Sequence, residues 1–516
     1  MTHYMIGVDI GTTSTKAVLF SRDGQAVSRF GVEYPLYTPM PGAAEQDPDE
    51  IFEAVLMAIR QCMVKADIPG EQVSFVSFSS AMHSLIVVDG EGTPLTQSIT
   101  WADNRSAEYT EKIKHELDGH GIYQRTGTPI HPMSPLSKLV WLKAEQAELF
   151  QPGVKCISIK EYVFFRLFNQ YVIDYSIASA TGLFNLSRLD WDQDVLDLIG
   201  ISRDQLSEPV PTTHSVSGLN EEYAKVTGLP ADTPFIVGAS DGVLSNLGVN
   251  AIEPGTVAVT IGTSGAIRAV TNKPVTDPKG RIFCYALTDK HWVIGGPVNN
   301  GGMIFRWLRD ELAGAEVETA RRLGRDPYDM LTDIAAQVPP GASGLLFHPY
   351  LAGERAPLWD PNARGSFFGL GMHHKKEHMI RSVLEGVIMN LYSVLLALEE
   401  LIGRPNRIQA TGGFARSVFW RQMLADIFDQ EVTIPESFES SCLGAVVLGL
   451  YGRGEIGSLE DVKHMVGSIH THRPDEAATS IYRELLPSFI RLPRLLAEEY
   501  EKIAQFQERH NSVRAD

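Results

Sequence analysis

Short apolar runs alternate with longer amphipathic stretches in the first half of the chain. Residues 73–78, 84–89 and 234–238 combine β-branched or aromatic residues with flanking turn formers, which predicts strands. Apolar positions recur at helical spacing over residues 50–65 and 103–117, and the acidic residues that follow Pro48 are typical of a helix start. This alternation predicts an α/β organisation in which amphipathic helices pack on a sheet.

The second half of the chain restarts this pattern after a turn at residues 251–255. We therefore expect two domains, at residues 1–249 and 250–516. The C-terminal stretch 478–507 is predicted to be a charged amphipathic helix, interrupted by Pro487 and Pro493. The other elements predicted for this half are a strand at 345–347, helices at 378–401 and 441–451, and a loop at 411–413.

Two glycine-containing loops follow apolar strands at corresponding positions of the two halves. They cover residues 9–16 and 260–265, and apolar runs on both sides of each predict strand-loop-strand hairpins. A glycine at position 11 or 262 lets backbone amides and neighbouring hydroxyls approach a phosphate closely. A single loop of this kind is ordinary turn chemistry. The pair predicts a duplicated fold that holds one phosphate chain from both sides.

Composition narrows the class of protein. The chain has 516 residues, enough for more than one domain core. Its 45 basic and 63 acidic residues give a net charge of −18 without a basic run, which argues against binding to nucleic acid or to an anionic membrane surface. The four cysteines are widely scattered, so we expect neither a zinc site nor a disulfide framework, and a reducing cytoplasm fits.

No targeting or membrane-spanning segment is expected. The polar Asp9 lies inside the first predicted strand, which does not fit a signal peptide. The longest uncharged apolar stretch is taken to be residues 442–451, about half of the roughly twenty residues that a transmembrane helix needs. We therefore expect a cytoplasmic protein.

Two motifs resemble the signatures of a known family. Residues 365–370 read Gly-Ser-Phe-Phe-Gly-Leu, and after seven residues comes His-Met-Ile-Arg-Ser-Val-Leu-Glu at 378–385. Residues 133–142 follow another signature, with Ala144 where a polar residue is usual. On these motifs the chain resembles FGGY-family carbohydrate kinases, of the sugar kinase, actin and heat-shock ATPase superfamily. The resemblance implies an α/β, two-domain actin-like ATPase (ribonuclease H-like) fold, with duplicated mixed sheets flanked by helices and an interdomain cleft.

The resemblance implies that Asp241 is the catalytic base. It would take the proton from a sugar hydroxyl as that hydroxyl attacks the γ-phosphate of ATP. The position is suitable, because Asp241 follows the apolar run 234–238 and ligands collect at the carboxyl ends of strands in α/β folds. An isolated Asp-Gly pair is more often a simple turn. The two phosphate loops favour the catalytic role.

The same resemblance implies a site for ATP and Mg²⁺. Asp9 is expected to hold Mg²⁺ through water, because Mg²⁺ prefers oxygen ligands and keeps several waters. Thr260 occupies the corresponding position of the second loop, so only the first loop offers a carboxylate. The residues expected to bind the nucleotide are Gly11, Thr12, Thr13, Ser14, Lys16, Gly262 and Thr263 at the phosphates, and Gly412, Gly413, Phe414 and Ala415 at the adenosine.

The expected sugar pocket combines two segments. Residues 80–83 resemble a segment of xylulose kinases, and residues 101–105 resemble the Trp-x-Asp-x-Arg segment of the family. A lone histidine after a strand is as often structural as a ligand. The residues expected to bind the sugar are Met82, His83, Trp101, Asp103, Arg105 and Asp241.

Residues 79–83 and 238–246 look most like the gluconate kinases of the family. This implies phosphorylation of the terminal hydroxyl of D-gluconate, and donors for its carboxylate are sought among His83, Arg105, His131, Lys138 and Lys160. Lys138 is the most clearly structural of these. A xylulose or other pentulose kinase is the alternative within this class, and a non-catalytic or chaperone-like actin-fold ATPase is the alternative outside it. Homodimers are common among similar kinases, and nothing in the chain decides the oligomeric state.

Overall fold

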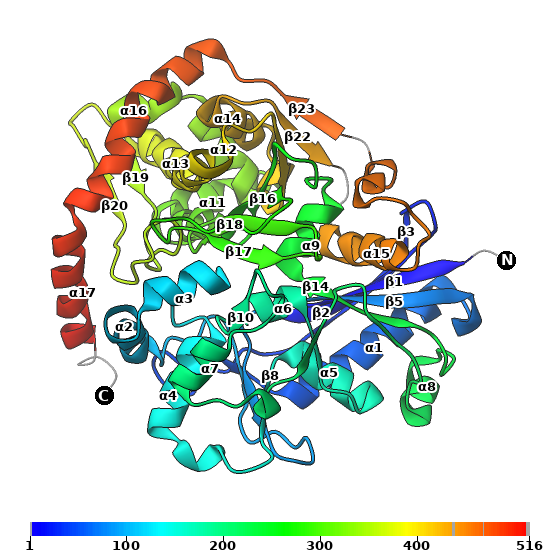
Figure 1. Cartoon of the computed structure of the whole chain (residues 1–516). Helices are drawn as coiled ribbons and strands as arrows, with labels where there is room; N and C mark the ends of the chain where they lie inside the picture. The colour runs from blue at the N-terminus through cyan, green and yellow to red at the C-terminus, as the bar shows by residue number, and fades with distance from the viewer. Residues whose placement is uncertain (1–2, 436–438, 468, 512–516) are drawn as a thin grey trace. The chain divides into compact units, whose positions relative to one another are not determined.

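The computed structural model describes residues 3–435, 439–467 and 469–511. These residues form two compact units, and Figure 1 shows sheets and helices in both. Two segments from the second half of the chain belong to the unit that contains the N-terminal half. Unit 1 consists of Met1–Pro254, Val270–Ile294 and Glu439–Gly467, and unit 2 of Gly255–Ala269, Gly295–Phe438 and Ser468–Asp516.

Unit 1 is built on a six-stranded mixed sheet with the order β13-β14-β5-β1-β2-β3. β1 and β2 form an antiparallel hairpin, β5 runs parallel to β1, and β14 runs parallel to β5. The central strands β5 and β14 are buried almost throughout. The bounds are β1 Tyr4–Ile10, β2 Ser14–Phe20, β3 Ala26–Glu33, β5 Val73–Ser80, β13 Ser215–Val216 and β14 Phe235–Ser240.

Helices cover both faces of this sheet, as the alternating pattern predicts. On one face, Ile6 packs in a core cluster with the apolar side of α1 (Pro48–Ala66). On the other, Met5 packs with α9 (Asp241–Gly248) and α15 (Ser440–Gly452). Successive side chains of a strand point to opposite faces, so β1 contributes to both cores.

Glycines let α15 lie directly against its neighbours. A Cβ at Gly444 would lie 2.0 Å from the carbonyl oxygen of Leu244 on α9, and one at Gly7 would lie 2.4 Å from that of Cys442 on α15. Any larger side chain at these positions would push backbone apart. The Gly/Ala-rich composition of this helix is therefore a packing requirement of unit 1.

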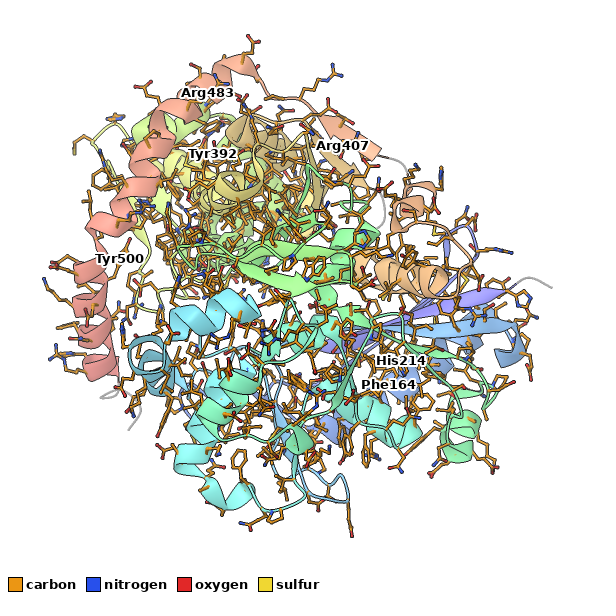
Figure 2. The ribbon with its side chains drawn as sticks, viewed as in Figure 1. Phe164, His214, Tyr392, Arg407, Arg483 and Tyr500 are labelled. Atoms are coloured by element: carbon orange, nitrogen blue, oxygen red, sulfur yellow. The ribbon has the colours of Figure 1, made fainter. Side chains whose placement is uncertain are left out.

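The rest of unit 1 consists of short strand pairs and helices, of which α3, α4 and α7 contribute to a further apolar cluster. Helix α5 (Ile159–Phe168) carries Phe164, which is labelled in Figure 2. This residue anchors the helix to the main sheet, because its ring lies 5.3 Å from that of Phe78 on β5. The remaining bounds are β4 Glu45–Gln46, β6 Ile86–Val88, β7 Ser98–Ile99, α2 Ala107–Glu116, α3 Gly119–Thr126, α4 Pro135–Glu145, β8 Lys155–Ile157, β9 Val172–Asp174, α6 Tyr175–Ser179, β10 Phe184–Asn185, β11 Asp190–Trp191, α7 Gln193–Ile199, β12 Glu208–Val210, α8 Glu221–Thr227 and β17 Phe283–Ala286; β18 covers Trp292–Val298.

Helix α2 begins four residues later than the periodicity predicts. The carboxylate of Asp103 accepts hydrogen bonds from the backbone N–H groups of Ala44 (2.9 Å) and Arg105 (3.1 Å). Aspartate competes for backbone donors in this way and favours turns over helix interiors. Residues 103–106 therefore form a turn.

Unit 2 repeats the arrangement of β1, β2 and β5. β15 and β16 form an antiparallel hairpin, and β21 runs parallel to β15. β22 and β23 continue this sheet. The repeat confirms the predicted duplication. The bounds are β15 Thr256–Ile261, β16 Gly265–Thr271, β21 Arg407–Thr411, β22 Val432–Pro435 and β23 Ile469–His472.

Helix α13 (Lys376–Ile402) is the longest helix described in unit 2. By length and composition alone it could cross a membrane, but 78% of its most apolar window is buried in the structure, as in the core helix of a folded domain. Residues 386–398 carry no charged side chain. This stretch includes the polar Asn390 and Ser393, and residues 440–452 are uncharged over the same length, so the expectation for residues 442–451 is not contradicted.

The C-terminal stretch forms two helices, α16 (Glu476–Leu495) and α17 (Ala497–Asn511), and both prolines lie inside α16. The prediction that they interrupt the helix was wrong. Pro493 has no N–H to donate to the carbonyl of Phe489, and the buried Nε2–H of His348 donates to that oxygen instead (2.9 Å). Tertiary structure thus replaces the missing hydrogen bond. The remaining bounds of unit 2 are α10 Gly302–Trp307, α11 Gly314–Arg322, α12 Pro327–Ala336, β19 Leu346–His348, β20 Ser366–Phe368 and α14 Val418–Phe428.

Candidate active site

The first glycine loop is the turn between β1 and β2. Gly11 N–H donates to the carbonyl of Ser14 (3.0 Å), which closes the turn. Thr12 is held from two sides: its carbonyl accepts from Gln46 Nε2 (2.6 Å), and its hydroxyl accepts from Trp101 Nε1 (2.9 Å). Thr13 is exposed. The structure therefore joins Trp101, expected at the sugar, to the phosphate loop within unit 1.

Asp9 lies at the end of β1, directly before this loop. Its two carboxylate oxygens accept hydrogen bonds from the hydroxyls of Ser79 on β5 (2.7 Å) and Ser441 on α15 (2.9 Å). These bonds fix the orientation of the carboxylate and leave lone pairs on both oxygens. An oriented, partly exposed carboxylate fits Mg²⁺ bound through water. The described residues hold no group of three or more His, Cys, Asp or Glu side chains suited to a metal.

Lys16 leaves the loop on β2 and forms an ion pair with Glu439 (2.8 Å). Burial favours the neutral amine, but the hydrogen bond and charge of Glu439 outweigh it and raise the pKa of Lys16. Arg29 also contacts Glu439 (3.1 Å). The charge of Lys16 is thus already balanced by Glu439 in this structure.

Asp241 is the first residue of α9 and follows directly after β14. Its Oδ1 accepts from the N–H of Gly242 (2.6 Å). The pairing of β14 with β5 shifts register between Ile236 and Ala239, where Gly238 has φ +70°. A Cβ at Gly238 would lie 1.6 Å from the carbonyl oxygen of Phe78. This bulge re-aims the end of the strand that carries Asp241.

His83 is buried and has φ +70°, an uncommon conformation outside glycine. Its Nδ1–H donates to the carbonyl of Ala180 (2.8 Å), which makes Nε2 the acceptor of the neutral ring. Its ring also lies edge-on to Tyr285 at 6.0 Å. Met82 is partly buried against two apolar clusters of unit 1. Backbone strain at a buried, oriented histidine is typical of a functional site.

Asp103 and Arg105 form a charged cluster with Glu45. Arg105 Nη2 lies 2.8 Å from Asp103 Oδ2 and 2.5 Å from Glu45 Oε1, and its guanidinium stacks over Trp141 at 4.7 Å. Asp103 is fully buried and also holds the N–H of Ala44. Arg105 is therefore neutralised within the cluster.

Two lysines considered for a substrate carboxylate are buried inside unit 1. Lys138 donates to the carbonyls of His83 (2.5 Å) and Thr100 (2.7 Å), and burial lowers the pKa of Lys138 to about 7. Lys160 forms an ion pair with Asp174 (2.6 Å). Both ammonium groups hold protein structure. His131 accepts a hydrogen bond from the N–H of Met133 (3.1 Å) through Nδ1.

The second glycine loop joins β15 and β16 in unit 2. Gly262 N–H donates to Ser264 O (2.9 Å), and the N–H groups of Gly302 and Met303 donate to Gly262 O (2.7 Å) and Thr263 O (3.0 Å). Both donors lie in the first turn of α10, so this helix holds the loop by its own N-terminus. The carbonyl groups of the hairpin loop are thus held by α10.

The loop predicted for the adenosine lies beside this hairpin. Gly412 has φ +108°, and a Cβ there would lie 2.3 Å from the carbonyl oxygen of Ile261. A Cβ at Gly413 would meet no atom within 4 Å. Phe414 is buried, with its ring edge-on to Trp420 at 5.9 Å, and Ala415 is also buried. The structure brings Gly262 and Gly412 together, and it gives Phe414 a packing role.

The sequence analysis missed a buried polar network in unit 2 centred on Glu354. This carboxylate accepts from Asn299 N (2.6 Å), Asn300 Nδ2 (2.9 Å), Asn390 Nδ2 (2.7 Å) and Arg355 N (2.8 Å). Burial raises the pKa of Glu354, and these donors oppose the shift. The network fixes the residues directly before α10, which holds the second hairpin. The charged pair at 354–355, directly after the apolar run at 345–353, was the available signal.

Each unit contains a glycine hairpin beside a parallel strand, and in unit 1 two carboxylates, Asp9 and Asp241, lie at the carboxyl ends of β1 and β14, the two strands that flank β5. This fold and these loops define an α/β enzyme that acts on phosphate groups. The model of the FGGY family of carbohydrate kinases, N-terminal domain, matches residues 4–248, and that of the C-terminal domain matches residues 257–453. The chain belongs to this family.

Relatives with known names resemble the chain along nearly its whole length. A gluconokinase of Bacillus subtilis (strain 168) is 61% identical over 508 residues, covering 98% of this chain and 99% of the relative. The crystal structure of a gluconate kinase from Lactobacillus acidophilus has a TM-score of 0.92 and 40% identity, covering 98% of this chain and 100% of that one. A structure described as a ligand-bound xylulose kinase from the same organism also gives 0.92 and 40%, over 97% and 100%.

These findings decide the class of enzyme. Family membership makes the protein an ATP-dependent sugar kinase, which excludes the non-catalytic ATPase considered above. The structural matches confirm the two-domain actin-like kinase fold.

Proposed function

We propose that this kinase transfers the γ-phosphoryl group of ATP to the terminal hydroxyl of D-gluconate and so forms 6-phosphogluconate. The observation that carries the proposal is the 61% identity to a gluconokinase over 98% of the chain. The match to the structure described as a xylulose kinase is weaker, at 40% identity. A pentulose kinase therefore remains the second candidate.

In this proposal Asp241 accepts the proton of the attacking hydroxyl. This role is supported by the position of Asp241 directly after β14, where the bulge at Gly238 changes the direction of the strand. The sugar is proposed to contact Met82, His83, Trp101, Asp103 and Arg105. Arg105 and Asp103 neutralise each other and the indole N–H of Trp101 is donated to Thr12, so His83 is the more direct hydrogen-bonding partner in this set.

The hairpin loops are proposed to hold ATP and Mg²⁺. Gly11 to Ser14 and Lys16 would contact the transferred phosphoryl group, and Gly262, Thr263 and residues 412–415 the rest of the nucleotide. Mg²⁺, held by Asp9 through water, supplies charge neutralisation to the phosphates when it is bound. Substituting Asp9→Asn should raise the Mg²⁺ concentration needed for half-maximal activity about tenfold or more. Isothermal titration of MgATP into the Asp9→Asn protein without sugar should show weaker Mg²⁺-dependent binding than in wild type, and this readout does not require turnover.

The boundary near residue 250 is proposed to separate a sugar-binding N-terminal domain from a nucleotide-binding C-terminal domain, and the two family matches lie on either side of it. A cytoplasmic location is also proposed, since all four cysteines are free and buried. Assembly as a homodimer is proposed from the resemblance alone. Sedimentation should then give twice the chain mass of 56.9 kDa.

A substrate panel tests the proposed reaction. The purified full-length protein is assayed with MgATP and D-gluconate, D-xylulose, D-ribulose or glycerol, with ADP release as the rate and ³¹P NMR to identify the product. We expect kcat/KM for gluconate to exceed that for every other compound by about tenfold or more. Phosphorylation confined to the ketoses would overturn the gluconate assignment and favour the pentulose kinase.

A further inference from the structure

A buried ion pair lies beneath the end of β14 in unit 1. Lys160 Nζ, from α5, is 2.6 Å from Asp174 Oδ2, at the end of β9. The two side chains are 4% and 0% exposed. Burying two charges costs more solvation free energy than their attraction commonly returns, so such a pair is weak evidence for a role in stability alone.

The ammonium of Lys160 also holds the backbone of β14. It donates to the carbonyl of Ala239 (3.2 Å), two residues before Asp241. Burial lowers the pKa of Lys160, while the charges of Asp174, Glu161 and Asp241 act in the opposite direction. These three carboxylates face the ammonium from the end of β9, from its own helix and from α9.

Asp174 connects the ion pair to the next residue of the strand. Its Oδ1 caps α6 by accepting from Ile177 N (3.0 Å). In the first turn of this helix, Ser176 Oγ accepts from Ser240 N (3.1 Å) and lies 3.0 Å from Ser240 Oγ. The ion pair and the helix that it caps therefore hold the two residues directly before Asp241.

The end of β14 lies just beyond a break in regular pairing, and pairing with β5 resumes only at Ala239 and Ser240. The register of β14 against β5 shifts between Ile236 and Ala239. Ladder hydrogen bonds alone leave the direction of a bulged strand less well defined. Contacts from Lys160 and Ser176 reach the strand just beyond the bulge.

We infer that Lys160 and Asp174 are positioning residues for phosphoryl transfer, which fix the backbone that carries Asp241. This inference rests on the proposed role of Asp241 as the base. Fixing the backbone keeps the Asp241 carboxylate in the geometry of attack.

The test replaces the ion pair by neutral side chains of similar size. The double variant Lys160→Met with Asp174→Asn removes both charges, leaves no unpaired buried charge, and keeps a residue that can cap α6. The matched control is Arg125→Met with Asp192→Asn. Asp192 likewise caps a helix, α7, through Val195 N (3.2 Å), and pairs with Arg125 Nε (3.1 Å). Arg125 lies on α3 and Asp192 follows β11, whereas Ala239 and Ser240 end β14.

For the Lys160 and Asp174 variant, we expect kcat to fall on the order of tenfold or more, while KM for ATP changes less than about twofold. The acid limb of the kcat/KM profile should stay in place, because the variant removes one positive and one negative charge together. The control should keep the wild-type kcat and profile at a similar melting temperature. Equal effects in the two double variants, or none in either, would overturn the inference.

Two further variants distinguish a failure of the positioning inference from a failure of the proposed base. Ser176→Ala retains the ion pair and removes the acceptor of Ser240 N, so kcat should fall severalfold with the acid limb unmoved. If the double variant does not fold, wild-type kinetics in Ser176→Ala would overturn the inference. Asp241→Asn should abolish gluconate phosphorylation. Retained phosphorylation in Asp241→Asn would instead remove the proposed base itself.

Discussion

Buried charged side chains in this protein mostly hold backbone in place. Lys138 binds the carbonyls of His83 and Thr100, and Glu354 binds the backbone before α10. Each of them satisfies polar groups that would otherwise lose water without replacement. Glu161 also binds backbone, since its Oε2 accepts from Ser158 N (2.6 Å).

Glu161 predicts a pH dependence of stability. Burial raises the pKa of Glu161 from 4.5 to about 7. The folded state then holds a proton that the unfolded state releases between these values, so the contribution of Glu161 to stability is full below pH 4.5 and is lost as the pH rises through 7. The loss is on the order of 3 kcal/mol. Glu161→Gln should remove this pH-dependent loss of stability. The variant should therefore melt at a higher temperature than wild type at pH 8 and at nearly the same temperature at pH 5.

Glu148→Gln is the control for this prediction, because Glu148 is exposed in the same unit. It should follow the wild-type melting curve at both pH values. A Glu161→Gln variant that melts lower than wild type at pH 8 would show that the carboxylate is ionised and stabilising.

Sequence alone identified residues whose role depends on local context. The glycines of both hairpins and Asp241 at a strand end could be found because their signals lie within a few residues. The pairing of Lys160 with Asp174 could not, since its partner lies on another element and no pattern connects the two. The donors around Glu354 come from three separate segments, which is equally hidden in one sequence.

At the scale of elements, the turn after β21 depends on one glycine. Gly412→Ala places a Cβ 2.3 Å from the carbonyl oxygen of Ile261 at φ +108°. Strain and overpacking should together cost on the order of 2–4 kcal/mol. Gly413→Ala is the matched control, because its Cβ meets no atom within 4 Å. Urea unfolding should show wild-type stability for Gly413→Ala, and equal losses in the two variants would contradict the argument.

Helix α16 offers a test of how a protein accommodates proline. His348→Phe removes the donor to Phe489 O and should cost about 1–3 kcal/mol, the desolvation penalty of an unpaired buried carbonyl. In a Pro493→Ala background the restored N–H can donate to the same oxygen, so His348→Phe should cost about 1 kcal/mol less. Thermal unfolding of the four proteins of this cycle measures the difference. Pro487→Ala is the control, and its effect on stability should not depend on His348→Phe. If the losses of His348→Phe and Pro493→Ala simply add, the hydrogen bond from His348 does not compensate for Pro493.

Element boundaries show where sequence reasoning stops. Helices α13 and α15 were predicted within two residues at each end, because α13 has a long periodic apolar pattern and α15 is an apolar run between Glu439 and Arg453. Periodicity failed at α2, where the carboxylate of Asp103 takes backbone donors. It also failed at α16, where a histidine about 140 residues away restores what proline removes. In both cases tertiary hydrogen bonds override a correct local preference.

At the scale of the whole molecule, repetition was the most informative property of the sequence. One Gly-Thr loop predicts only a turn, whereas two at corresponding places predict a duplicated sheet, and the structure has β1-β2-β5 and β15-β16-β21 in the same arrangement. Sequence could not show that residues 270–294 and 439–467 belong to unit 1. A segment belongs to a unit because its apolar face packs there, as α15 packs with β1, and its order along the chain does not decide this.

The net charge of the molecule predicts a dependence on salt. At −18 the protein repels anions at long range, and gluconate is an anion at pH 7. Raising the ionic strength from about 0.01 to 0.15 M shortens the Debye length from about 30 to 8 Å, so kcat/KM for gluconate at saturating MgATP should rise about threefold. A neutral sugar from the substrate panel is the control and should show no change. If kcat/KM for gluconate falls with salt instead, a local positive field at the sugar pocket outweighs the net charge, and His83 and Arg105 become the first residues to substitute.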